Sequence, residues 1–399
     1  MTTPRRAGLA QGIVITLIGL LPMMAIVTLM PIVPALVNNF RDVPGIQTLA
    51  PLVLSAPGLC VALFSPFAGA LTDRIGRRRL LLIFATLYGL GGVLPYFISS
   101  FEALLASRLL LGVGEGFILT VGNALLGDYF EKEERAKWLM WQSLSGPAAG
   151  VLLMTVSGRL SMIQWNLPFL IYGVALLVAA LAFFAAYEPD RSSERVDNEP
   201  GTATMMAFPS GLMMRIAMST FLLSALYFVY TLQFSLALDE MGIKKGSELG
   251  NLTAMASIGV PVGGLLFKFI AKRSNAFQFS LVFTLLGAGM VGIGLNLGLT
   301  PALVCAFVQQ LGAGMVIPVL ISWSLRELPD RFRGRGMGWW CSAFFLGQFV
   351  SPLFVTLVRG AVGSLLHTFL VSGLICLAIA LFQGLGARRA PAVPARLAR

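Results

Sequence analysis

Two charged residues stand seven positions apart in an otherwise apolar stretch, SRLLLGVGEG at residues 107–116. In a membrane-spanning helix, Arg108 or Glu115 costs at least about 2.5 kcal/mol unless it faces a cavity or a partner. Seven residues are two helical turns, so both side chains leave the same face about 10 Å apart along the axis. A relaxed salt bridge would therefore need Arg108 to reach along its stem, or water between the two groups.

Glu115 is a candidate protonatable switch. Burial favours its neutral acid, whereas a nearby Arg108 favours the carboxylate, so a movement that changes either would load or release a proton. The alternative is a protonated Glu115 hydrogen-bonded permanently inside the bundle. Acids inside membrane spans are rare and usually functional, which favours the switch. Arg108 is then either its electrostatic partner or a contact to substrate.

The surrounding chain predicts membrane-spanning helices. Of its 399 residues 57% are hydrophobic and only 12% are charged, whereas soluble domains average about 25% charged residues. Apolar windows of about 20 residues, the length that spans a hydrocarbon core, recur throughout. We expect an all-α membrane protein with twelve spans, near 10–35, 47–70, 79–99, 103–127, 137–157, 167–187, 212–237, 250–271, 276–297, 301–325, 337–358 and 363–386.

The basic residues predict the orientation of these spans. Most of the 29 Lys and Arg residues fall in the termini and in alternate loops, whereas the opposite side carries only Arg41, Arg159, Lys244, Lys245 and Arg359. This asymmetry places both termini in the cytoplasm, and the short loops favour a bacterial inner membrane. The net charge of +11 therefore indicates contact with lipid headgroups and does not imply a nucleic-acid partner.

The longest polar interruption divides the chain into halves. EPDRSSERVDNEPGTAT at 188–204 combines charge, proline and small polar residues, which is typical of a linker. We predict a six-helix bundle over 1–187, a cytoplasmic linker over 188–210 and a second six-helix bundle over 211–399. Two pseudo-symmetric halves with a site at the midplane between them form a transporter architecture.

The loop after the second span carries the most specific motif, GALTDRIGRRRLLL from Gly69. With six plus six spans, it resembles the signature loop of the major facilitator superfamily, Gly-x-Leu-x-Asp-Arg-x-Gly-Arg-Arg. The resemblance implies that Asp73 faces the start of the eleventh span near Gly336 and that Arg77 pairs with Asp128. It assigns a conformational latch to Gly69, Asp73, Arg74, Gly76, Arg77, Arg78 and Asp128.

Two further stretches carry the same resemblance. Arg108, Gly112 and Gly116 resemble the family's span-four pattern, although Leu111 stands where glutamine often follows the arginine. The span-five motif of exporting branches is similar to Gly146, Pro147 and Gly150, with departures at Gln142 and Val151. A Gly-Pro kink allows close helix packing, which favours export but also fits a purely structural bend. The Arg…Gly-x-Gly-Glu order is also similar to one helix of spinster-type lipid transporters.

Substrate contacts are expected among polar and aromatic residues in the middle of spans. The candidates are Asn123, Trp141, Gln142, Tyr227, Tyr230, Gln233, Gln309, Gln310, Trp323 and Gln348. Each one fits a helix–helix hydrogen bond or an interfacial anchor equally well. The four cysteines, Cys60, Cys305, Cys341 and Cys376, show no metal-ligand spacing and are expected to be packing residues. The single histidine, His367, lies near the external end of the last span, and we expect it to have no functional role.

These features predict a monomeric, proton-coupled secondary transporter that exports a small amphipathic molecule by alternating access. A proton-coupled importer of a sugar or organic acid, or a spinster-like lipid transporter, is the alternative. An intramembrane enzyme would need clustered catalytic or metal-binding residues at one depth, and the spans offer none. A channel would need a charged ring or a filter sequence, which is also missing. We expect no cofactor and no metal.

Overall fold

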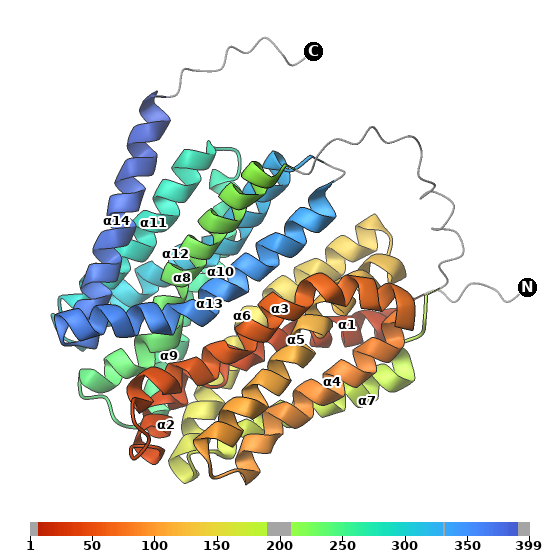
Figure 1. Cartoon of the computed structure of the whole chain (residues 1–399), viewed down its shortest axis with the longest axis horizontal. Helices are drawn as coiled ribbons and strands as arrows, with labels where there is room; N and C mark the ends of the chain where they lie inside the picture. The colour runs from red at the N-terminus through yellow and green to blue at the C-terminus, as the bar shows by residue number, and fades with distance from the viewer. Residues whose placement is uncertain (1–6, 190–208, 330–331, 390–399) are drawn as a thin grey trace, which may run out of the picture. The chain divides into compact units, whose positions relative to one another are not determined.

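The computed structural model describes residues 7–189, 209–329 and 332–389 of the chain (Figure 1). Within these ranges the secondary structure is helical and contains no strand. Twelve helical segments are long and apolar enough to cross a membrane. The expected all-α membrane fold with twelve spans is therefore confirmed.

The twelve spans are built from fourteen α-helices and three short 3-10 helices among the described residues. The first six spans comprise α1 (Leu9–Val27), η1 (Met30–Ile32), α2 (Val33–Asn39), α3 (Ile46–Ile75), α4 (Arg77–Val93), η2 (Leu94–Phe97), α5 (Phe101–Tyr129), α6 (Lys132–Ile163), η3 (Leu167–Tyr172) and α7 (Gly173–Ala185). The last six comprise α8 (Ser210–Glu240), α9 (Gly246–Ser257), α10 (Gly259–Ile270), α11 (Asn275–Gly294), α12 (Leu299–Glu327), α13 (Arg333–Val362) and α14 (Leu365–Arg389).

Contacts group the chain into two compact units. Unit 1 holds Met1–Ala254 with Glu327–Phe354, and unit 2 holds Met255–Arg326 with Val355–Arg399. Most of α13 belongs to unit 1 because it packs on α3, where the Ser342 hydroxyl donates to the Ala62 carbonyl at 2.8 Å. The division into two six-helix bundles stays a prediction, and residues 190–208 of the expected linker lie outside the described residues.

The first span is broken after Val27, and the break exposes carbonyls that other spans bind. The Leu29 amide donates to Ile26 and the Ile32 amide to Leu29, so the carbonyls of Ala25 and Thr28 lose their helical donors. The Tyr172 hydroxyl donates to Ala25 at 3.1 Å, and the Ser157 hydroxyl donates to Thr28 at 2.5 Å. Neighbouring side chains thus satisfy the freed backbone groups, as a membrane interior requires.

Helices α6 and α9 approach each other within unit 1 through glycine. A Cβ atom on Gly158 would lie 2.9 Å from the Cα of Gly250, and one on Gly250 would lie 2.6 Å from the Met154 carbonyl oxygen. No other residue type fits so close a backbone approach, a common device of membrane helices. This crossing places α9 with the first six spans.

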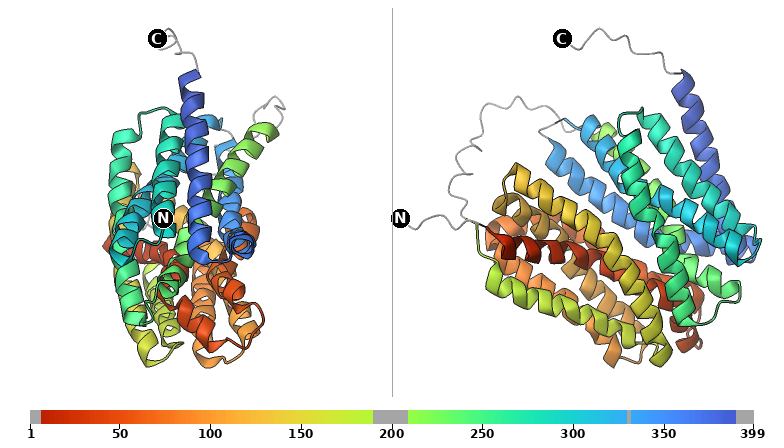
Figure 2. Two further views of the ribbon diagram at one scale, coloured as in Figure 1. Left: turned by 90° about the vertical axis from the view of Figure 1, so that its left-hand side faces the viewer. Right: turned by 180° about the vertical axis from the view of Figure 1, so that it is seen from behind.

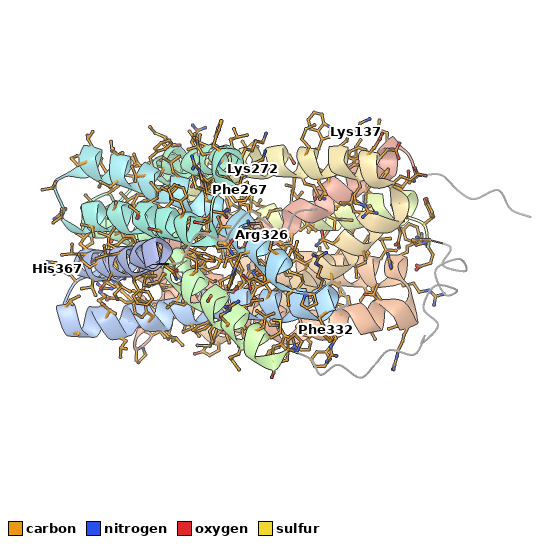
Figure 3. All side chains as sticks on the ribbon, turned by 90° about the horizontal axis from the view of Figure 1, so that it is seen from above. Lys137, Phe267, Lys272, Arg326, Phe332 and His367 are labelled. Carbon is orange, nitrogen blue, oxygen red and sulfur yellow. The ribbon has the colours of Figure 1, made fainter. Side chains whose placement is uncertain are left out.

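In unit 2, α11 and α14 run side by side (Figures 1 and 2). A Cβ atom on Gly287 would lie 2.8 Å from the Gly373 carbonyl oxygen, so glycine sets their spacing. Figure 3 shows His367 at the start of α14, at the opposite end of this unit from Lys272 and Arg326. His367 is exposed there.

Candidate functional site

Helix α5, which carries Arg108 and Glu115, packs between α3 and α4 in unit 1. A Cβ atom on Gly112 would lie 2.5 Å from the Cα of Pro57 on α3, and one on Gly114 would lie 2.8 Å from the Phe84 carbonyl oxygen on α4. Gly116 again faces α3, where its Cβ would lie 3.4 Å from the Cα of Val61. The glycines around Glu115 thus admit two neighbouring helices.

The Arg108 side chain is completely buried, and neutral groups surround it. Its Nη2 atom donates to the carbonyl oxygens of Gly91 and Gly92, each at 3.0 Å. The guanidinium carbon lies 5.1 Å from the Phe169 ring centroid and 4.9 Å from that of Tyr172. Cation–π attraction and carbonyl dipoles therefore stabilise the charge. Its Nε and Nη1 atoms are buried without a hydrogen-bond partner.

Two tyrosines beside Arg108 connect its surroundings to the first span. The Tyr88 hydroxyl of α4 donates to the Leu21 carbonyl at 2.5 Å, and the Tyr172 hydroxyl donates to Met24 at 3.0 Å. The two rings lie 6.1 Å apart between centroids. Arg108 is thus the centre of a packed cluster that joins α1, α4, α5 and η3.

Glu115 is buried in the same helix, with a relative exposure of 2%. Its Oε2 atom has no hydrogen-bond partner, and no ion pair joins it to Arg108 among the described residues. Two turns separate the residues, and the Arg108 guanidinium binds the α4 carbonyls instead of reaching along α5. The sequence left open whether Arg108 meets Glu115 or substrate. In this structure its guanidinium makes no ion pair with Glu115, and a contact with substrate stays a prediction.

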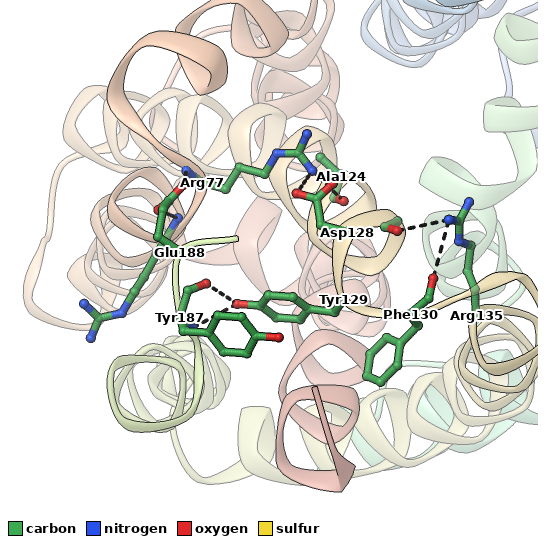
Figure 4. Close-up of polar contacts among 10 residues, drawn as sticks. Arg77, Ala124, Asp128, Tyr129, Phe130, Arg135, Tyr187 and Glu188 are labelled. Atoms are coloured by element: carbon green, nitrogen blue, oxygen red, sulfur yellow. Dashed lines mark hydrogen bonds and ion pairs between the residues drawn. The ribbon is translucent and has the colours of Figure 1, made fainter. Parts of the chain in front are cut away.

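A second charged cluster lies where α1 begins, at the end of unit 1 that we call the N-terminal face (Figure 4). The Arg77 guanidinium contacts the Asp128 carboxylate and donates to the Ala124 carbonyl at 2.8 Å. This is the pairing that the family resemblance implies. Its role as a conformational latch stays a prediction.

Glu188 completes this cluster, and sequence analysis missed it. Its two carboxylate oxygens accept the backbone N–H groups of Arg77 and Arg78 at 2.7 and 2.9 Å. A carboxylate at this position satisfies the open N-terminus of α4 and complements its dipole. Gly76 makes the preceding turn at a φ of 101°, which favours glycine.

The segment after α7 is fixed to the same cluster by an aromatic pair. Tyr129 and Tyr187 stack with ring centroids 4.6 Å apart. The Tyr129 hydroxyl donates to the Tyr187 carbonyl at 2.5 Å and accepts its N–H at 2.9 Å (Figure 4). Arg78 adds a bond to the Phe183 carbonyl at 2.7 Å.

For the remaining residues of the predicted latch, the structure describes few contacts. Arg74 is exposed at the end of α3. The side chain of Asp73 and the environment of Gly69 lie outside what the structure describes, although both residues belong to α3. Their expected contact with the start of α13 stays a prediction.

The span-five motif packs against α1. A Cβ atom on Gly150 would lie 3.4 Å from Met23 Cε, and one on Gly146 would lie 3.9 Å from Leu20 and Met23. Pro147 lies inside α6 between them. At these distances a larger side chain would make ordinary contacts with the broken first span, so the packing fits either interpretation of the motif.

Seven of the ten substrate candidates lie in unit 1, in different environments. Asn123 and Trp141 are exposed, Tyr227 is half-buried, and Tyr230, Gln233 and Gln348 are buried. Gln142 donates to the Ile15 carbonyl at 3.1 Å, so it has a structural role between α6 and α1. Gln348 lies against Gly58 of α3 with its Oε1 atom unpartnered.

The other three candidates belong to unit 2. Gln310 donates to the Ser257 hydroxyl at 3.2 Å, and Trp323 packs edge-on against Phe279 at 5.2 Å between centroids. Gln309 is fully buried, and neither its Nε2 nor its Oε1 atom has a partner. A pocket shared by all ten residues stays a prediction.

Unit 1 contains a cavity of about 490 Å³ between α3, α5 and α13, within the usual size range of small-molecule sites. It is lined by Ser65, Pro66, Thr120, Arg335, Met337, Gly338, Trp339 and Cys341. None of the ten candidates lines it. For the Arg108 cluster, the sequence signals are the Gly91–Gly92 pair and the tyrosines inside spans. No comparable sequence signal marks Ser65 or Cys341 as cavity residues.

Twelve apolar helices, with buried charges in a glycine-packed interior, define a polytopic membrane protein of the transporter type. A model of the Major Facilitator Superfamily matches residues 15–304, and the chain therefore belongs to this family. The sequence resemblance is confirmed at the level of the family.

Curated relatives include proteins named for drug resistance. The chain is 29% identical over 191 residues to the tetracycline resistance protein, class B, of Escherichia coli, covering 47% of each chain. It is 28% identical over 256 residues to the multidrug resistance protein MdtL of Shewanella sp. (strain ANA-3), covering 60% of this chain and 64% of that one. The chain thus spans about half to two-thirds of the length of these relatives.

Solved structures share the fold. A point mutant of the nucleoside transporter NupG superposes with a TM-score of 0.75 at 11% identity, covering 94% of this chain and 99% of that chain. A bacterial homolog of the human lysosomal transporter Spinster, inward-facing and unoccupied, gives 0.71 at 16% identity, covering 96% and 98%. At these identities the likeness concerns the fold alone.

Proposed function

We propose that this protein exports a small amphipathic molecule in exchange for protons, with Glu115 as the proton-carrying residue. The observation that carries the proposal is the burial of Glu115 with an unpartnered carboxyl oxygen. An acid in this position is neutral when dry and ionises when water reaches it, so its protonation follows the conformational cycle.

Arg108 supports this role at a distance. Because its guanidinium is bound to the Gly91 and Gly92 carbonyls, it supplies a fixed positive charge without neutralising Glu115 by direct contact. That charge limits the cost of a transient carboxylate in the span. The carboxylate therefore persists long enough to be reprotonated from the other side.

The relatives support the class of substrate and the direction of transport. Two of them are named for resistance to tetracycline or to several drugs, which accords with export of amphipathic compounds. Gly146 and Gly150 lie in ordinary van der Waals contact with α1, and their likeness to the span-five motif of exporting branches accords with export. From the charge asymmetry of the loops, we place the protein in a bacterial inner membrane with both termini in the cytoplasm. We expect it to be a monomer.

Transport into proteoliposomes under an imposed pH gradient tests the proposal, with tetracycline and a lipophilic fluorescent dye as probes. With one proton exchanged per molecule, a gradient of one pH unit supports about tenfold accumulation, since 1.4 kcal/mol is a factor of ten. A proton ionophore should abolish this accumulation.

The Glu115→Gln variant should reach a concentration ratio of about one in this assay, because an amide carries no exchangeable acid proton. It should still exchange substrate at equal pH. Glu102→Gln is the matched control, because Glu102 is exposed in the first turn of the same helix, and it should behave as wild type. Uphill transport by Glu115→Gln would exclude Glu115 as the coupling residue.

A further inference from the structure

The cavity between α3, α5 and α13 has a polar inner wall and an exposed outer wall. Ser65, Thr120 and Cys341 supply two hydroxyl groups and a thiol. Arg335 and Trp339, at the other side of the lining, are both exposed. A site of this size has room for water, and its hydroxyl and thiol groups supply the two to four polar partners that a bound water needs.

The polar wall adjoins the turn of α5 that carries Glu115. The Thr120 hydroxyl donates to the Gly116 carbonyl at 3.0 Å. The Ser65 hydroxyl lies 3.7 Å from the position of a Cβ atom on Gly116 and 4.0 Å from the Cys341 sulfur. Glu115 does not line the cavity, and Ser65, Thr120 and Cys341 lie between its turn of α5 and the cavity space.

The cavity lies on the N-terminal-face side of Glu115. Thr120 follows Glu115 by five residues, about 7.5 Å along a helix that ends at that face with Tyr129. Helix α13 runs antiparallel to α3, because Cys341 meets Ser65 whereas Gln348 meets Gly58. Since α3 ends at the N-terminal face, α13 begins there, and Arg335 marks the outer end of the cavity.

The titratable groups around Glu115 come from four neighbouring segments and from its own helix. Those near enough for their charge to interact with that of Glu115 are Cys60 from α3, Tyr88 from α4, Tyr172 from η3, Cys341 from α13 and Arg108 of its own helix. At neutral pH the thiols and phenols are uncharged, and Arg108 points into its own cluster. On the cavity side, a proton leaving Glu115 meets the hydroxyl and thiol groups of Ser65, Thr120 and Cys341 first, and the Arg335 cation at the outer end.

We propose that this cavity is the path by which Glu115 exchanges its proton with water at the N-terminal face, with Ser65 and Cys341 as the last polar layer. The inference rests on the proposed function of Glu115. In the releasing step the carboxylic O–H bond breaks and its proton passes to the Ser65 oxygen, while the proton that this hydroxyl already held passes to a cavity water. The water becomes hydronium, the hydroxyl is restored and the carboxylate remains. Reloading is the reverse. The path closes when α3, α5 and α13 pack more tightly.

Cys341 allows a direct test, because it lines the cavity. A protein with Cys60→Ala, Cys305→Ala and Cys376→Ala keeps it as the single thiol. In membrane vesicles of known orientation, a charged methanethiosulfonate should modify it from the N-terminal face. Modification should slow gradient-driven transport about tenfold, because it interrupts proton transfer, and should leave exchange at equal pH unchanged.

The matched control carries Leu346→Cys and Cys341→Ser in the same background, because Leu346 is exposed on the same helix and does not line the cavity. A membrane-permeant maleimide should modify both proteins but slow only the one with Cys341. Thr120→Val should also slow the gradient-driven step about threefold, whereas Thr120→Ser should not, because only serine keeps the hydroxyl.

Reaction of Cys341 from the opposite face alone, or complete modification without a change in gradient-driven transport, would overturn the path. These outcomes differ from a failure of the proposed function, in which Glu115→Gln transports uphill whatever the reactivity of Cys341. A coupled wild type, an uncoupled Glu115→Gln and an unaffected Cys341 adduct together would reject the path alone.

Discussion

Two carboxylates of helix α5, Glu115 and Asp128, lie thirteen residues apart, and their surroundings are opposite. Asp128, at the N-terminal face, meets the Arg77 guanidinium, and Glu188 beside it accepts two backbone N–H groups of α4. Glu115, about 20 Å deeper along the helix, has neither an ion pair nor a partner for its Oε2 atom. The cation nearest to it along the helix, Arg108, is bound to neutral carbonyls and aromatic rings.

This difference distinguishes charges that hold helices together, at Asp128 and Glu188, from the Glu115 carboxyl group, which we propose carries a proton. At the N-terminal face water lowers the cost of charge, so paired groups remain ionised and fix α4, α5 and the segment after α7 together. Inside the span an unpaired carboxylate is expensive, so Glu115 responds to any movement that admits water. Pairing makes the first cluster stable, and lack of pairing leaves Glu115 free to titrate.

Among the variants that test this comparison, we expect the largest loss of stability from an added methyl group at the helix contact next to Glu115. Gly112→Ala places a methyl group 2.5 Å from the backbone of Pro57, which cannot move aside, whereas Gly116→Ala meets its nearest atoms at 3.4 Å or more. We expect a loss of about 3 kcal/mol for the first, as for an overpacked core, and less than about 0.5 kcal/mol for the second. Thermal unfolding in detergent measures both. Equal melting temperatures would contradict the close approach of α3 and α5.

A smaller effect, and the most direct test of the comparison, comes from two double-mutant cycles. Arg77→Gln with Asp128→Asn should show a coupling of about 2 kcal/mol, because the variants break a partly buried ion pair. Arg108→Gln with Glu115→Gln should show a coupling below about 0.5 kcal/mol, because no contact joins these two residues. A large coupling in the second cycle would mean that the midspan charges pair after all.

The smallest effect is expected at Glu188. Glu188→Gln keeps the shape but loses the negative charge at the start of α4, so stability should fall by about 0.5 to 1 kcal/mol, less at high salt. Asp42→Asn makes the same change of charge at an exposed loop residue and should leave the melting temperature unchanged. If both variants behave alike, the bonds from Arg77 and Arg78 contribute nothing to stability.

Much of the fold follows from local sequence. Apolar windows of span length predicted the twelve spans, because a membrane requires about 20 apolar residues wherever the chain crosses it. The GRRR motif and the acid at the end of span four indicated the Arg77–Asp128 contact through the family resemblance. Glu188 was missed because its partners are backbone N–H groups 110 and 111 residues away in the sequence. Every residue except proline has such a group, so no residue type in the sequence indicates this contact.

The sequence was less informative about the site. It identified Arg108 and Glu115 because charge is conspicuous among leucines and glycines. It did not identify Tyr88, Tyr172 or Phe169, since aromatic residues in spans are ordinary packing residues until a cation lies against them. Gln142 was placed among substrate contacts, yet its amide binds the first span, because a midspan amide serves either role.

The sequence by itself determined that this chain crosses the membrane twelve times, which loops carry the positive charge, and that one acid lies deep within a span. Each of these properties depends on residue type along a single segment. Only the tertiary structure decided that Arg108 binds the α4 backbone and that a hydroxyl-lined cavity adjoins the Glu115 turn. Those outcomes depend on how closely helices approach, and glycine-to-backbone contacts between distant segments set that distance.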